Sequence, residues 1–155
     1  MSTMRMLTKI AAVTALAIPM FGIAPGVASA TTAVSESVSA ATPAGCSSVT
    51  QIGVTGYVTV GGQTMASVKQ YKGCGKNYAY MYVWQGYRDT HSSWQGCTSI
   101  VTGTTIQDVQ CNDNMVEIWS SGADTLSQCT QAIGWNGTGP WPVAGDAVGK
   151  TDVRC

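Results

Sequence analysis

The chain has 155 residues, of which eight are basic and eight acidic, and its formal net charge at pH 7 is zero. Nucleic acids and anionic membranes bind proteins mainly through clustered positive charge. The chain has no run of basic residues, so both are excluded as partners. Only 10% of the residues are charged, and contacts made by the folded protein are expected to be polar but mostly uncharged.

Residues 1–30 are predicted to be a signal peptide for export. Two basic residues precede a largely apolar stretch from Ile10 to Ala24, and Ala28 and Ala30 then form the small-x-small pattern of a signal peptidase site. The alternative is a membrane anchor, which the short and Pro-interrupted apolar stretch disfavours. We therefore expect a secreted protein that is cleaved after Ala30 and has no membrane contact afterwards.

Residues 31–45 are rich in Ala, Ser and Thr and are predicted to form a flexible leader, whose trimming stays open. All six cysteines follow the leader. An even number of cysteines in a short exported chain predicts disulfides, and no pair has the C-x-x-C spacing of a redox or zinc site. Residues 46–155 are thus predicted to be one disulfide-bonded β domain without metal or cofactor.

Six cysteines allow fifteen pairings, and the sequence gives a local argument for one of them. The segment between Cys97 and Cys111 looks like two strands around a turn, which places these cysteines opposite each other in a hairpin. A glycine turn at residues 61–62 would similarly bring Cys46 close to Cys74, which leaves Cys129 to pair with Cys155. The resulting guess is Cys46–Cys74, Cys97–Cys111 and Cys129–Cys155.

From Cys46 onwards, β-branched and aromatic residues alternate between glycine turns, which predicts a series of short strands. The expected strands are 54–60, 64–71, 77–84, 99–101, 105–111 and 115–119. Residues 125–133 fit either a short helix or another strand, and residues 134–149 are rich enough in Gly and Pro to predict a long loop. The fold class expected is all-β, a small disulfide-stapled antiparallel sandwich or barrel with at most one short helix.

One stretch, VKQYKGCGKNYAYMYV at residues 68–83, resembles the motif of an actinobacterial secreted domain family of unknown function. In that motif a tyrosine-bearing strand precedes Cys-Gly-x-Asn-Trp-Ala. Here Tyr78 stands at the position of the tryptophan. The resemblance implies an exported β-rich protein and no particular activity.

Every second side chain of the strand 77–84 carries a ring, and these side chains share one face of a sheet. The four are Tyr78, Tyr80, Tyr82 and Trp84. Buried Tyr and Trp need partners for their polar groups, which favours a wet recognition surface. Such rings also pack across strands and stabilise small sheets, and this structural interpretation is the preferred one. The opposite face, with Met81 at its centre, has the compact apolar pattern of a core.

Two further tryptophans, Trp135 and Trp141, lie in the predicted Gly- and Pro-rich loop. They either form a stiff recognition loop or fold back over the core. Together with the four strand rings they are the candidate binding residues. The function favoured is a secreted, non-catalytic binding protein whose partner is an extracellular protein, bound as hydrolase inhibitors bind, or a polysaccharide. A structural cell-surface protein is the second hypothesis.

An enzyme ranks only third among the hypotheses, because the sequence lacks the common catalytic motifs. The chain has one histidine, His91, and contains neither G-x-S-x-G nor H-E-x-x-H. No pair of carboxylates with the placement of a glycosidase stands out. The remaining candidate is a small ribonuclease with Glu117 as general base, His91 as general acid and Arg88 as phosphate contact. Glu117 fits an exposed strand position equally well.

Overall fold

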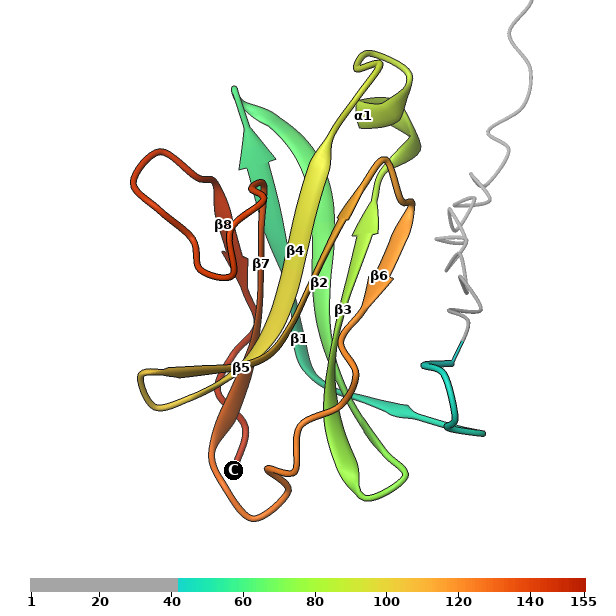
Figure 1. The fold of residues 1–155 in the computed structure, drawn as a ribbon, viewed down its shortest axis with the longest axis vertical. Coiled ribbons are helices and arrows are strands. Elements are labelled where there is room, and N and C mark those ends of the chain that lie inside the picture. Colours follow the sequence, from blue (N-terminus) through green and yellow to red (C-terminus); the bar gives the residue numbers. More distant parts are fainter. Residues whose placement is uncertain (1–41) are drawn as a thin grey trace, which may run out of the picture. The chain divides into compact units, whose positions relative to one another are not determined.

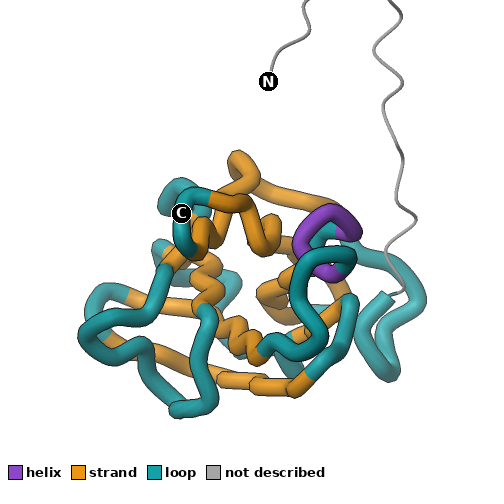
Figure 2. Tube along the Cα trace, turned by 90° about the horizontal axis from the view of Figure 1, so that it is seen from above, coloured by secondary structure: helices purple, strands orange, loops and turns teal. Residues whose placement is uncertain are grey.

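The computed structural model describes residues 42–155. The predicted signal peptide and residues 31–41 of the predicted leader lie outside the described residues. The described part consists of two antiparallel four-stranded sheets that face each other (Figures 1 and 2). The predicted all-β fold class is confirmed, in its sandwich form.

The first sheet has the strand order β1-β2-β3-β6 and the second has the order β5-β4-β7-β8. The bounds are β1 Thr50–Val60, β2 Gln63–Gly73, β3 Lys76–Val83, β4 Gln95–Thr102, β5 Thr105–Asp113, β6 Glu117–Trp119, β7 Thr130–Trp135 and β8 Val148–Lys150. One short helix, α1 Gln85–Arg88, lies in the connection from the first sheet to the second.

Strands β1 to β6 correspond to the six predicted strands. Of the two alternatives for residues 125–133, the strand is the one found, since β7 begins at Thr130 and the range contains no helix. The predicted loop 134–149 is too long, because Gly134 still pairs with Thr98 of β4 and the last residues of the range enter β8. A Cβ atom on Gly134 would lie 2.6 Å from a methyl group of Val68 in the other sheet. The glycine that indicated a loop is thus a strand residue at a close contact between sheets.

The core lies between the two sheets. Ala79, Met81 and Val83 of β3 are fully buried there, which confirms the compact face of this strand as core. Met81 lies over two glycines of the second sheet: a Cβ on Gly96 would be 3.2 Å from its Cε, and a Cβ on Gly134 would be 3.3 Å from its Sδ. The absent side chains of these glycines make the space that the methionine fills.

One side of the sandwich is closed by direct contact between backbones. A Cβ atom on Gly56 of β1 would lie 2.2 Å from the carbonyl oxygen of Lys150 in β8, and a Cβ on Gly149 would lie 2.5 Å from the carbonyl carbon of Tyr57. Both distances are far below van der Waals contact. The two edge strands therefore approach this closely only because neither residue has a side chain.

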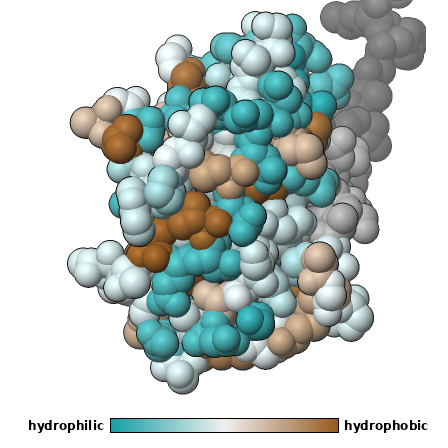
Figure 3. Space-filling view, in the orientation of Figure 1, coloured by the Kyte–Doolittle hydropathy of each residue, from teal (hydrophilic) through white to brown (hydrophobic). Residues whose placement is uncertain are grey.

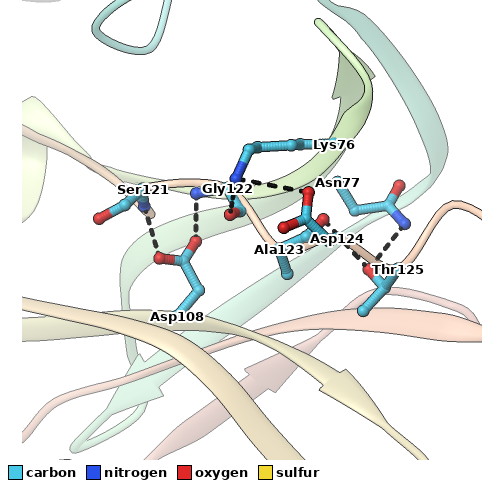
Figure 4. Close-up of polar contacts among 8 residues, drawn as sticks. All are labelled: Lys76, Asn77, Asp108, Ser121, Gly122, Ala123, Asp124 and Thr125. Atoms are coloured by element: carbon cyan, nitrogen blue, oxygen red, sulfur yellow. Dashed lines mark hydrogen bonds and ion pairs between the residues drawn. The ribbon is translucent and has the colours of Figure 1, made fainter.

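The other side is closed by polar contacts around the connection between β6 and β7 (Figure 4). Asp108 sits in a bulge of β5 at a φ of 59°, a conformation that Asp tolerates better than most residues. Its carboxylate accepts hydrogen bonds from the backbone N–H groups of Ser121 (2.9 Å) and Gly122. From the first sheet, Lys76 donates to the carbonyl oxygen of Gly122 (3.2 Å), and Asn77 donates to the hydroxyl of Thr125 (3.0 Å). This polar cluster fixes a connection and is structural.

The three disulfides pair as guessed from the sequence, which confirms that guess. Cys46–Cys74 joins the segment before β1 to the turn between β2 and β3. Cys97–Cys111 links directly opposite residues of β4 and β5, and Cys129–Cys155 ties the last residue to the start of β7. Within residues 42–155, no helix has the length and apolar character needed to span a bilayer.

Candidate functional site

The ring-bearing face of β3 is mostly enclosed. Tyr78 and Tyr80 are buried in a small second core on the outer face of the first sheet, where Tyr71 of β2 and Trp119 of β6 flank them. The ring centroids of Tyr80 and Trp119 are 4.6 Å apart. Cys46 and other residues before β1 pack on the same cluster. Buried rings cannot contact a partner, so Tyr78 and Tyr80 leave the set of candidate binding residues.

The remaining part of the stripe is accessible. Tyr82 is half-buried and contacts Trp84 edge-to-face at 5.5 Å between centroids, and Trp84 is 37% exposed. Tyr57 of β1, on the same outer face, is 55% exposed. The sequence interpretation did not single out Tyr57, although its alternation with the core residue Val58 places it outside.

A carboxylate lies beside the buried rings. Glu117 of β6 is directly opposite Tyr82 and next to Tyr80 in the sheet. The Tyr80 hydroxyl is buried near this carboxylate. Burial raises the pKa of Tyr80 well above its ordinary value, and the negative charge of Glu117 raises it further. The pKa of Tyr71 is raised by the same two causes.

These shifts predict that the free energy of unfolding falls as the pH rises above about 10. In the unfolded chain tyrosine loses its proton near that pH, whereas the buried Tyr80 keeps it, so folding requires proton uptake there. This contribution of the buried tyrosine to stability is fully present below about pH 10 and is lost progressively as the pH rises above that value. Tyr80→Phe removes the titrating group, and urea unfolding at pH 8, 10 and 11 is expected to show a smaller alkaline loss for this variant. Tyr57→Phe, on an exposed ring, should keep the wild-type profile. Equal losses in wild type and Tyr80→Phe would contradict the interpretation.

The two tryptophans of the C-terminal loop have opposite environments. Trp135 is fully buried on the outer face of the second sheet with Cys97 and Ile133, so it also leaves the candidate set. It does not help to enclose the tyrosines of the first sheet. Trp141, in contrast, is 57% exposed. The two tryptophans thus divide between the two alternatives: Trp135 is folded back into the protein, and Trp141 stays exposed on the loop.

The segment from Asn136 to Ala147, here called the Trp141 loop, is held by its own hydrogen bonds. The Asn136 N–H donates to the carbonyl oxygen of Ala147 (3.2 Å), and the Asn136 Oδ1 accepts from the Ala147 N–H. Near the tip, the Asp146 carboxylate accepts from the N–H of Val143 (2.9 Å). Figure 3 shows hydrophobic atoms at the projecting tip of this loop. The loop thus presents an apolar tip on a closed base.

The base of the Trp141 loop rests on a disulfide. The Cys97 sulfur lies 3.0 Å from the carbonyl oxygen of Gly137 and 3.6 Å from that of Gly139. Since this sulfur is part of a disulfide and carries no hydrogen, these are packing contacts. They connect the loop to the crosslinked pair of strands β4 and β5.

Two residues of the ribonuclease hypothesis, His91 and Arg88, are engaged in local contacts. The His91 ring stacks on Tyr87 at 3.8 Å between centroids, and its Nδ1 lies 3.0 Å from the Tyr87 carbonyl oxygen. Arg88 donates through Nε to the Val83 carbonyl oxygen (3.2 Å). No hydrogen bond or ion pair joins His91, Arg88 and Glu117 in the described part of the chain. In the same range no three His, Cys, Asp or Glu side chains are placed to hold a metal ion.

Comparison with protein-family models, with curated proteins and with solved structures finds no match to this chain. The resemblance of residues 68–83 to an actinobacterial family stays an expectation.

Proposed function

We propose that this protein is an exported, non-catalytic binding protein that inserts the Trp141 loop into an apolar cleft of a protein partner, as an inhibitor of an extracellular hydrolase would. The observation that carries the proposal is a tryptophan with 57% exposure on a loop that is closed at its base. Single exposed apolar residues are common on protein surfaces. A large exposed ring on a restrained loop is a stronger indication of a contact site.

The chemistry of the loop tip suits a protein partner. Pro140 and Pro142 flank Trp141, and each fixes a backbone φ angle and removes an N–H group that would otherwise need a partner. Residues 137–145 carry no charge, so burying them in a cleft requires no desolvation of ions. Tryptophan is among the residues that contribute most to protein interfaces.

Rigidity of the loop lowers the entropic cost of binding. The hydrogen bonds between Asn136 and Ala147 close its base, and the contacts with Cys97 hold it against a crosslinked hairpin. A segment that is already ordered loses less conformational freedom when it binds. Disulfides persist in oxidising compartments, so the three present support the proposal of export.

The proposal is tested by inhibition assays against a panel of extracellular proteases and amylases. Wild-type protein is expected to inhibit at least one enzyme, and Trp141→Ala is expected to weaken inhibition by about 30-fold or more, since a central tryptophan anchor contributes about 2 kcal/mol or more. Leu126→Ala is the matched control, because Leu126 is also an exposed large apolar residue but lies before β7, outside the loop. Absence of inhibition across the panel, or equal potency of the Trp141→Ala variant, contradicts the proposal.

A further inference from the structure

A hollow of about 350 Å³ lies among the connections that meet near the start of β4. Its wall comes from α1 and the segment after it, from the turn between β5 and β6, and from the residue that follows β7. Six of its lining residues are Tyr87, Trp94, Gln95, Asp113, Asn114 and Asn136. The volume lies within the range of roughly 300–1,000 Å³ typical of small-ligand sites. We propose that this hollow binds one residue of a neutral carbohydrate, independently of the protein contact assigned to the Trp141 loop.

Two amide groups of the hollow have a fixed orientation. The Asn114 Oδ1 accepts a hydrogen bond from the Trp94 N–H (2.9 Å), and the Asn114 N–H donates to the Trp94 carbonyl oxygen (2.9 Å). The Asn136 Oδ1 accepts from the Ala147 N–H. With each oxygen engaged, each Nδ2 keeps its two donor hydrogens, and neither Nδ2 has a partner within residues 42–155. Both side chains line the hollow, which is therefore bordered by two amide groups whose orientation is set before a ligand arrives.

An acceptor and a further amide stand beside these donors. Asp113, the last residue of β5, is directly opposite Gln95, the first residue of β4, in the ladder. Within the described range the Asp113 carboxylate has no ion pair. An ionised carboxylate only accepts hydrogen bonds, whereas an amide both donates and accepts. Neighbouring hydroxyl groups of a sugar can donate hydrogen bonds to the Asp113 carboxylate, and they can both donate to and accept from the Gln95 amide.

Aromatic rings supply the apolar part of the hollow. The Trp94 indole N–H donates to the Met115 carbonyl oxygen (3.1 Å), so its polar edge is already engaged and its ring is left for apolar contact. Tyr87 is buried, with one face of its ring stacked on His91. Sugar rings have an apolar C–H face and a rim of hydroxyl groups. A half-buried indole surrounded by amides and a carboxylate matches both features.

The charge of the hollow decides between kinds of carbohydrate. No Lys or Arg lines it, and Asp113 is its one carboxylate. An acidic sugar would bring a second negative charge next to Asp113 without a compensating cation, which disfavours it. Neutral sugars meet no such penalty. An amino sugar carries a positive charge and would be attracted to Asp113 by charge alone. It is therefore tested separately.

The test uses titration calorimetry of the mature protein with three sets of oligosaccharides. The sets are neutral oligomers of glucose, mannose, xylose and N-acetylglucosamine, oligomers of galacturonate, and oligomers of glucosamine. Saturable binding of at least one neutral oligomer and no binding of galacturonate are expected. Asp113→Asn and Gln95→Ala should each weaken binding of the neutral oligomer about tenfold, by loss of hydrogen bonds to the ligand. Asp124→Asn makes the same charge change near Lys76, away from the hollow, and should leave the affinity unchanged.

Three outcomes overturn the inference. They are absence of binding to every neutral oligomer, binding of glucosamine oligomers alone, and unchanged affinity in both hollow variants with native near-UV circular dichroism. Trp141→Ala is expected to keep sugar binding, and Asp113→Asn is expected to keep enzyme inhibition. Failure of either proposal is thus distinguishable from failure of the other.

Discussion

Reduction of the three disulfides is expected to unfold the described domain at neutral pH. The bridges close loops with sequence separations of 28, 14 and 26 residues. By the chain-entropy model each contributes about 3–4 kcal/mol, and the total stability of a small domain is about 5–15 kcal/mol. Loss of all three removes most or all of that stability. Circular dichroism and tryptophan fluorescence, with and without dithiothreitol, measure the effect.

Paired substitutions separate the contributions of the bridges. Cys129 and Cys155 are both exposed, so replacing this pair by alanine removes a chain constraint with little loss of packing. A decrease of about 3–4 kcal/mol in the free energy of unfolding is expected. Replacing Cys97 and Cys111 removes the constraint on a shorter loop of the unfolded chain, and it also disturbs the packing under the Trp141 loop. An unchanged melting temperature after complete reduction would show that the sheets are held by their cores alone.

Met81→Ala is expected to lower the free energy of unfolding by about 2–5 kcal/mol. The methionine is fully buried and fills the space over two glycines of the facing sheet. Those glycines are paired strand residues without side chains that could fill the space, so most of the cavity is expected to remain. Urea denaturation measures the loss.

The matched control for this variant is Met115→Ala. Met115 is 51% exposed in the turn between β5 and β6, and its truncation is expected to change stability by at most about 0.5 kcal/mol. A similar loss in both variants would mean that the effect reflects the removal of methionine in general. A loss below about 1 kcal/mol for Met81→Ala would show that the facing sheets close over the gap.

The sequence predicted several features of the fold because they depend on neighbouring residues. Alternation of side chains placed Met81 in the core, and the hairpin between Cys97 and Cys111 followed from the turn that separates two short strands. The short strand β8 was missed because only three residues form it, within a Gly- and Pro-rich stretch. Its position is set by pairing with β7 and by the close approach of Gly149 to β1, and both are contacts between distant segments.

The candidate hollow could not be predicted from the sequence for a related reason. Its polar side chains come from the ends of β4 and β5 and from the connections beside them, Asn136 lies about 40 residues beyond Gln95 in the sequence, and no motif links them. Asn114 and Asn136 read as ordinary turn residues until their oxygens are seen to accept backbone N–H groups.

By itself, the sequence determined a sheet-rich domain with three crosslinks, since side-chain alternation and cysteine spacing are local properties. Tertiary structure alone decided which rings reach solvent. Tyr78 and Tyr82 share one face of the same strand, yet the segment before β1 packs on the cluster around the first and leaves the second partly open. Trp135 and Trp141 are six residues apart, and only the second is exposed. Exposure of a ring depends on what the folded chain places over it, and that covering comes from residues with no periodic relation to the ring.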